Sequence, residues 1–153
     1  MLLRSRLYLV IAILGTLALL TVACAQTTPT PEPSGSRGFE DTAWMLESYG
    51  EKGNLQTVIK GTEITAIFDS TKAQVHGSAG CNRYFGDHEI SNNKLSILQI
   101  AYTEMYCLEP EGVMEQEQKY LKALQAAESY EIRDGKLRIT CGAEVLIFVA
   151  KQE

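Results

Sequence analysis

The sequence predicts an α+β fold that is mostly antiparallel β, arranged as a curled or barrel-like sheet, with one amphipathic helix before the last three strands. From Ala43 onward, short alternating apolar runs are separated by turn residues about every eight to twelve positions, which is typical of antiparallel sheets. A single stretch between residues 110 and 127 changes to helical spacing. Asp134 and Gly135, between two alternating runs, favour a type I′ hairpin turn.

The first part of the domain is predicted to contain strands only. The candidate strands lie at 43–49, 62–69, 73–79, 84–91 and 94–100, with a sixth at 101–107 that either stands alone or continues the fifth. A polar loop from Gly50 to Asn54 follows the first strand. Asn92 and Asn93 tolerate the positive φ of a tight turn, so they are predicted to join two strands as a hairpin.

The helical stretch is expected to begin near Pro110, which suits the first helical position, and to run for about four turns. One apolar stripe is formed by Val113, Met114, Tyr120, Leu121, Leu124 and Ala127. The acids of the helix are interpreted as a solvated face, on which Glu115 and Lys119 form an i, i+4 pair. Strands within 130–140 and at 144–150 complete the domain.

The N-terminus has the features of a secretory signal. Arg4 and Arg6 precede an uncharged run from Leu7 to Leu20, and "TVAC" follows at 21–24. This segment resembles the lipobox of bacterial lipoproteins, so residues 1–23 are predicted to be a lipoprotein signal peptide and Cys24 the site of lipidation. An ordinary cleaved signal with an incidental cysteine, or an uncleaved anchor helix, is the alternative.

Residues 24–39 are predicted to be the lipidated cysteine and a flexible linker rich in Pro, Ser and Thr, followed by a domain at 40–151. Without residues 1–23 the chain has 12 basic and 19 acidic side chains, a formal charge of −7. This charge argues against nucleic acid as a partner and against a basic membrane-binding face. Because of the signal segment, the expected location is extracytoplasmic, in the cell envelope. Because of the acidic charge, membrane contact is expected only through the lipid.

No catalytic, metal or cofactor site is predicted. The cysteines after the linker, Cys81, Cys107 and Cys141, include no C-x-x-C pair, which argues against a zinc site. His76 and His88 flank Cys81 in the sequence, but His76 is expected to point to solvent. "HEIS" at 88–91 lacks the second histidine of a zinc-protease helix. Cys81 is instead interpreted as a disulfide staple, because exported thiols within reach of one another pair.

Four segments form a distinctive series along the domain: "GSAGCNRYFG" at 77–86, "TEMYC" at 103–107, "EQEQKYLKAL" at 115–124 and "VLIF" at 145–148. Together they resemble the META domain, the fold of the HslJ-type heat-shock lipoproteins. The resemblance covers roughly residues 40–150. It implies a small β-rich domain with a helix, often lipid-anchored, without established catalysis, and linked to heat stress, antibiotic tolerance and secretion or motility.

The resemblance also implies a bridge between Cys81 and Cys107. Cys141 is an addition to the family pattern, so pairing of Cys141 with Cys81 or with Cys107 stays open at this point. The position of Cys141 in the last hairpin, in phase with Leu137 and Ile139, favours a buried free thiol.

The expected function is that of a non-enzymatic envelope lipoprotein that supports stress tolerance through an unknown envelope protein partner. The alternative is a β module that binds a small ligand or inhibits a protease. Candidate binding residues are Asn82, Arg83, Tyr84 and Tyr106, although Asn82 could instead bond its own backbone at a turn. Tyr84, Phe85, Tyr102 and Tyr106 gathered around an open concavity would favour a ligand, whereas their burial would favour a structural role.

Overall fold

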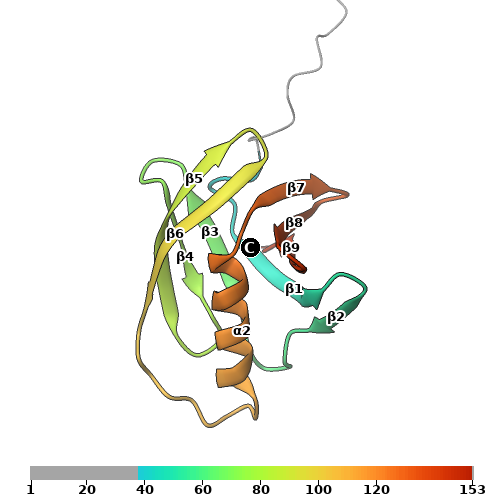
Figure 1. Cartoon of the computed structure of the whole chain (residues 1–153). Helices are drawn as coiled ribbons and strands as arrows, with labels where there is room; N and C mark the ends of the chain where they lie inside the picture. The colour runs from blue at the N-terminus through green and yellow to red at the C-terminus, as the bar shows by residue number, and fades with distance from the viewer. Residues whose placement is uncertain (1–37, 153) are drawn as a thin grey trace, which may run out of the picture. The chain divides into compact units, whose positions relative to one another are not determined.

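The computed structural model describes residues 38–152, which form an antiparallel sheet and one helix (Figure 1). The elements are β1 (Trp44–Glu51), β2 (Asn54–Thr57), β3 (Thr65–Asp69), β4 (Gln74–Ser78), β5 (Arg83–Ser91), β6 (Lys94–Tyr102), α2 (Val113–Gln125), β7 (Ser129–Arg133), β8 (Lys136–Cys141) and β9 (Glu144–Ala150). The predicted fold class is confirmed, including the helix before the last three strands. In this part of the chain no helix is long and apolar enough to span a membrane.

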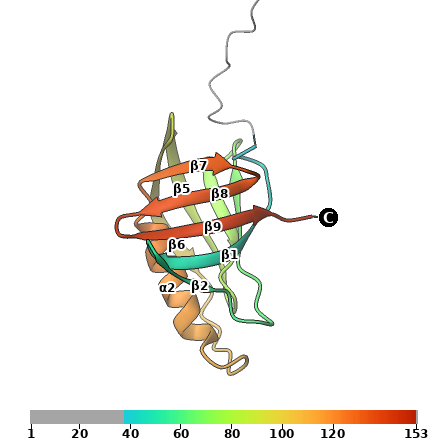
Figure 2. The same cartoon turned by 90° about the vertical axis from the view of Figure 1, so that its right-hand side faces the viewer.

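The sheet closes into a barrel because β1 pairs with strands on both of its edges. One edge pairs with β9 along most of its length, and the other pairs first with β3 and then with β2. The ring therefore consists of β1 and β3 to β9, as Figures 1 and 2 show. Its weakest joint lies between β6 and β7, which pair only at Lys94 and Ser129. Helix α2 packs against β6, β8 and β9.

The barrel interior is filled by alternate residues of the strands and by the apolar side of α2. Tyr84 of β5 and Tyr120 of α2 are both buried, and their hydroxyl groups are 2.6 Å apart. The Tyr84 hydroxyl also donates to the carbonyl of Thr65 at 2.9 Å. Burial raises the pKa of both phenols, so both are neutral at physiological pH.

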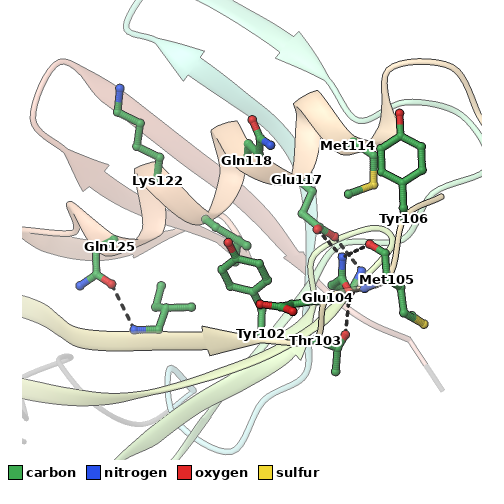
Figure 3. Close-up of a pocket in the computed structure, with 13 residues that line it drawn as sticks. Tyr102, Thr103, Glu104, Met105, Tyr106, Met114, Glu117, Gln118, Lys122 and Gln125 are labelled. Carbon is green, nitrogen blue, oxygen red and sulfur yellow. Dashed lines mark hydrogen bonds between the residues drawn. The ribbon is translucent and has the colours of Figure 1, made fainter. Parts of the chain in front are cut away.

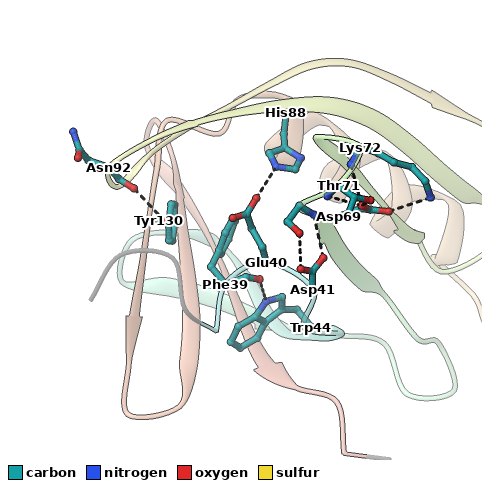
Figure 4. Close-up of polar contacts among 11 residues, drawn as sticks. Phe39, Glu40, Asp41, Trp44, Asp69, Thr71, Lys72, His88, Asn92 and Tyr130 are labelled. Carbon is teal, nitrogen blue, oxygen red and sulfur yellow. Dashed lines mark hydrogen bonds and ion pairs between the residues drawn. The ribbon is translucent and has the colours of Figure 1, made fainter. Parts of the chain in front are cut away.

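The segment before β1 closes one part of the core (Figure 4). Phe39 has no exposed surface, and its ring centroid lies 3.9 Å from that of Tyr130 and 4.3 Å from that of Phe68. The indole of Trp44 donates to the Phe39 carbonyl at 2.9 Å. Phe39, the last residue of the predicted linker 24–39, is thus part of the packed domain. Cys24 and the signal segment lie outside the described residues.

The two histidines lie in different environments and neither bonds to Cys81. His88 is buried edge-on to Phe68, with ring centroids 5.5 Å apart, and its Nε2 atom is 3.7 Å from Glu40 Oε1 (Figure 4). Burial lowers the pKa of His88 despite this carboxylate, which favours the neutral imidazole. His76 is half-buried and lies opposite Phe85 in the β4–β5 pairing. His88 therefore has a packing role.

The local turn chemistry is confirmed in both predicted hairpins. Asn92, between β5 and β6, has a φ of 57°. Asp134 and Gly135, between β7 and β8, have φ values of 53° and 73°, as a type I′ turn requires. These residues fix the register of their hairpins by local geometry alone.

Three elements differ from the prediction. The loop after β1 contains strand β2, whose residues are all exposed and so lack the apolar alternation by which strands are recognised. Strand β6 ends at Tyr102, and 103–107 is not a strand. The helix begins at Val113 rather than near Pro110, because Gly112 has a φ of 84°, outside the helical region.

Candidate functional site

The buried carboxylate of Glu117 joins the helix to the corner between β4 and β5. The residue is 2% exposed. Its Oε2 atom accepts hydrogen bonds from the backbone N–H groups of Cys81 at 3.1 Å and Asn82 at 2.7 Å. Its Oε1 atom accepts from Asn82 Nδ2 at 2.6 Å. Glu117 therefore holds the start of β5 against α2.

This burial corrects the interpretation of the helix acids as one solvated face. Glu115 is exposed and pairs with Lys119 at 2.9 Å, as predicted. Glu117, in contrast, is four residues from Val113 and four from Leu121, so it lies on the apolar stripe of the helix. A carboxylate is tolerated there because three N–H groups replace its hydration.

The side chain of Asn82 extends the network to the segment after β6. Its Oδ1 atom accepts from Thr103 Oγ1 at 2.7 Å and from the Met105 N–H at 2.8 Å. Its Nδ2 atom donates to the Met105 carbonyl at 3.0 Å (Figure 3). The amide thus pairs with Met105 as a neighbouring strand would, and does not bond its own backbone as the turn interpretation expected.

A disulfide between Cys81 and Cys107 holds the other end of this segment. The pairing implied by the family resemblance is therefore confirmed, and both alternatives that involve Cys141 are excluded. Cys141 is a buried free thiol, as predicted. Burial raises its pKa to about 12, so the thiol is neutral and unreactive at physiological pH. Residues 103–107 are called the pinned segment below.

Gln116, next to Glu117, joins the helix to a second loop. The residue is 2% exposed; its Oε1 atom accepts from the Ile59 N–H at 2.7 Å and its Nε2 atom donates to Thr62 Oγ1 at 2.9 Å. The sequence predicted no role for Gln116 and placed Glu117 on the solvated face of the helix. The only signal was their position within the apolar stripe, where polar side chains need partners from elsewhere in the fold.

A groove with a volume of about 450 Å³ lies between the end of β6, the pinned segment and α2. Tyr102 is 54% exposed and Tyr106 is 78% exposed. Figure 3 shows the Tyr102 ring beneath the helix and the Tyr106 ring beside Met114, whereas the Met105 side chain points away from the helix. The remaining lining residues are Asn82, Ile100, Thr103, Glu104, Glu117, Gln118, Leu121, Lys122 and Gln125.

The predicted binding residues are only partly brought together. Asn82 and Tyr106 both line the groove. Tyr84 is 2% exposed and belongs to the core. Arg83 and Phe85 line a second, smaller hollow next to His76, which shares Tyr102 and Thr103 with the groove. Of the four aromatic residues proposed as a test, Tyr102 and Tyr106 thus face an open groove, and Tyr84 is structural.

The polar groups at the base of the groove bond to one another. The Oδ1 and Nδ2 atoms of Asn82 and the Oε1 atom of Glu117 all form hydrogen bonds within the domain. In residues 38–152 no cluster of three His, Cys, Asp or Glu side chains is placed to hold a metal ion. The network therefore holds a shape and presents no activated nucleophile.

Comparison with known proteins agrees with this architecture. The profile of the META domain matches residues 37–153. The chain belongs to the META domain family. Among curated proteins, none is significantly similar to it in sequence.

Three solved structures share the fold of this META domain. A protein from Burkholderia xenovorans, solved by NMR, is 26% identical with a TM-score of 0.66, over 82% of this chain and 92% of its own. A second NMR structure is 22% identical with a TM-score of 0.57, over 79% and 96%. A DUF4847 family protein from Bacteroides vulgatus, solved by crystallography, is 13% identical with a TM-score of 0.54, over 76% and 97%. The last two show similarity of fold alone.

Replacing either bridged cysteine is expected to destabilise the domain more than replacing the free one. Cys81→Ala and Cys107→Ala should each lower the free energy of unfolding by about 2–5 kcal/mol, because the unfolded chain gains freedom without the bridge. Cys141→Ala, the matched control, loses only a small buried group and should cost about 1 kcal/mol. Denaturant unfolding of the oxidised protein measures all three. Equal losses, or a linkage to Cys141 in non-reducing peptide maps, would contradict the assignment.

Asn82→Ala is expected to release the pinned segment while the bridge stays intact. The variant loses four side-chain hydrogen bonds, to Glu117, Thr103 and both backbone groups of Met105. At about 1 kcal/mol for each bond, the expected loss of unfolding free energy is on the order of 4 kcal/mol. The Met105 amide should also exchange its hydrogen faster than in the parent.

The matched control for this variant is Asn93→Ala, at an exposed turn residue whose substitution should change stability by less than about 0.5 kcal/mol. Hydrogen exchange and denaturant unfolding measured on both variants give the comparison. An unchanged Met105 exchange rate in Asn82→Ala would show that the bridge alone holds the segment.

Proposed function

We propose that this META domain is a non-enzymatic, lipid-anchored module of the bacterial cell envelope that supports stress tolerance by binding a protein partner. The observation that carries the proposal is the exposed apolar surface that begins at the end of β6. Tyr102, Met105, Tyr106 and Leu108 are each more than half exposed. Apolar side chains gathered in this way mark interaction sites on soluble domains.

The rigidity of this surface supports a binding role. The pinned segment is held by the Cys81–Cys107 bridge and by the Asn82 side chain, although its own side chains add little to the core. A segment ordered before binding loses less conformational entropy when a partner arrives. The same segment carries Tyr106, and aromatic side chains contribute strongly to protein interfaces.

The disulfide supports an extracytoplasmic location. Structural disulfides form and persist in oxidising compartments and are rare in the bacterial cytoplasm. The charged start, apolar run and "TVAC" at 21–24 support export and lipidation at Cys24. The net acidic domain has no reason to lie on an anionic membrane surface, which leaves its exposed face available to a protein.

A small-ligand site is the second candidate. The groove volume of about 450 Å³ lies within the range of small-molecule pockets, which favours this alternative. Such a pocket also needs polar groups that fix the ligand. Asn82 and Glu117, the buried polar residues in the groove, are already bonded to each other and to the pinned segment. Apart from exposed side chains such as Gln118 and Lys122, the open polar groups of the groove belong to the backbone of Tyr102. A protein partner fits these groups and the exposed aromatic side chains better than a small ligand does.

The anchor is tested by metabolic labelling with an alkyne analogue of palmitate. The full chain is expected to take up the label and to fractionate with membranes, because Cys24 provides the acceptor thiol. Cys24→Ala should lose the label, and Cys141→Ala should keep it. A wild-type chain that stays unlabelled would contradict the proposed lipidation.

The partner is tested by photocrosslinking in cells under heat stress. A photoreactive phenylalanine analogue at Tyr106 in the anchored chain is expected to give a discrete protein adduct, because this side chain is 78% exposed at the proposed surface. The same analogue at Ile132, which is 39% exposed and does not line the groove, is the matched control. Adducts of equal yield at both positions, or none at Tyr106, would count against a protein partner there.

A further inference from the structure

Beyond Lys94, strand β6 has an edge that no other strand within residues 38–152 covers. Its backbone pairs with β7 only at Lys94, next to the turn. Further along, the side chain of Gln125 takes the place of a strand: its Nε2 atom donates to the carbonyls of Ile97 and Leu98, and its Oε1 atom accepts from the Ile100 N–H at 3.2 Å. Beyond Ile100 this substitution ends.

The backbone groups left open on this edge follow from the alternation of an antiparallel pair. The Thr103 N–H donates to the Arg83 carbonyl at 3.0 Å, so the backbone hydrogen-bonding groups of Thr103 point toward β5. Those of Tyr102 and Ile100 therefore point away from β5, in agreement with the bond between the Ile100 N–H and Gln125. The Tyr102 N–H and C=O groups make no hydrogen bond to any described residue.

The pinned segment continues the same edge past the end of the strand. Both backbone groups of Met105 bond to Asn82, on the β5 side. The N–H and C=O groups of Glu104, between Thr103 and Met105, make no hydrogen bond to any described residue. Tyr102 and Glu104 therefore present backbone groups that an added strand could bond, and both residues line the groove.

Folded proteins usually protect such an edge with proline, lysine, a bulge or a covering element. Residues 97–106 contain neither proline nor lysine, and the register shift between β5 and β6 lies before Ile100, outside the open stretch. The disulfide and the Asn82 amide fix residues 103–107 in place, and α2 stands beside them across the groove without bonding to Tyr102. The edge is thus open and ordered in advance.

We propose that the groove binds an extended segment of the protein partner, which adds as a strand to the edge formed by residues 102–104. This inference rests on the proposed function and names the form in which the partner is recognised. Strand addition draws affinity from main-chain hydrogen bonds and specificity from the pockets that receive alternate side chains. Here the apolar side chains that line the groove include Ile100, Tyr102 and Leu121.

The charges around the groove indicate that this segment carries Lys or Arg beside its apolar residues. Glu104, Glu109 and Glu111 are exposed, and none forms an ion pair with a described residue. All three lie in the stretch that leads from β6 to α2, whereas Lys122 is the one basic side chain among the groove residues. A strand with alternate basic side chains matches these acids and is discriminated from an acidic one.

A short alternating Val-Lys peptide with blocked ends is the probe, added to the full chain with its anchor in lipid nanodiscs. Hydrogen exchange at single amides is the measurement. At a peptide concentration ten times the dissociation constant, exchange of the Tyr102 amide should slow about tenfold, and that of Glu104 should also slow. The same peptide methylated on alternate backbone nitrogens should give no protection, and a Val-Glu peptide should bind at least tenfold more weakly.

Two variants at one position separate the backbone bond from the side chain. Tyr102→Pro removes the edge N–H but leaves the pairing with β5, since proline is tolerated where its nitrogen faces outward. It should abolish binding of the Val-Lys peptide. Tyr102→Ala, the matched control, loses the ring but keeps the N–H, so protection of the Glu104 amide should persist at higher peptide concentration. If the proline variant does not fold, the methylated peptide decides.

Three results would overturn the inference. These are absence of protection at millimolar Val-Lys peptide, equal protection by the methylated peptide, and equal binding by Tyr102→Pro. Equal binding of the Val-Glu peptide would overturn the basic character assigned to the segment. A Tyr106 adduct that persists alongside any of these results would leave the proposed protein partner in place and reject only strand addition.

Discussion

The position of α2 in the fold depends on hydrogen bonds to one buried carboxylate, that of Glu117. Removing a carboxylate from water has an effective cost of several kcal/mol in a protein interior, unless hydrogen bonds replace its hydration. Glu117 recovers this cost only where the N–H groups of Cys81 and Asn82 meet it, at 3.1 and 2.7 Å. The carboxylate therefore selects one position of α2 against the β4–β5 corner, which the apolar stripe alone would leave free to slide. Through Asn82, the same constraint reaches Met105.

A side chain of α2 also bonds to backbone groups of β6 that no neighbouring strand pairs with. Between β6 and β7 the ring is joined at a single residue pair, so backbone groups that a strand would satisfy must find other partners. The Gln125 amide bonds to backbone groups of β6 and so replaces part of this backbone ladder. Elsewhere on α2, Gln116 bonds to the backbone of Ile59 and Glu117 to the β4–β5 corner in the same way. The replacement stops short of Tyr102, which is why an open strand edge borders the groove.

Features determined by neighbouring residues could be predicted from the sequence, and features determined by distant ones could not, apart from the Cys81–Cys107 bridge that the family resemblance implied. Asn92 and Asp134 set their turns locally, and the helix followed from its apolar spacing. Strand β2 is recognisable only from its pairing with β1, because all of its residues are exposed. Glu117 was assigned to a solvated face because its partners lie 35 and 36 residues away. For the same reason, Asn82 was expected to bond locally.

The pinned segment is held more firmly than the barrel requires. The core closes through Phe68, Phe148 and Leu124, to which residues 103–107 contribute no fully buried side chain. Even so, a disulfide and the Asn82 amide both act on these residues. Fixing a backbone residue costs about 1–2 kcal/mol in entropy, so a segment of this length would otherwise lose on the order of 5 kcal/mol when it met a partner. Because the loss occurs on folding instead, a partner that bound the exposed edge and its aromatic side chains would not incur it.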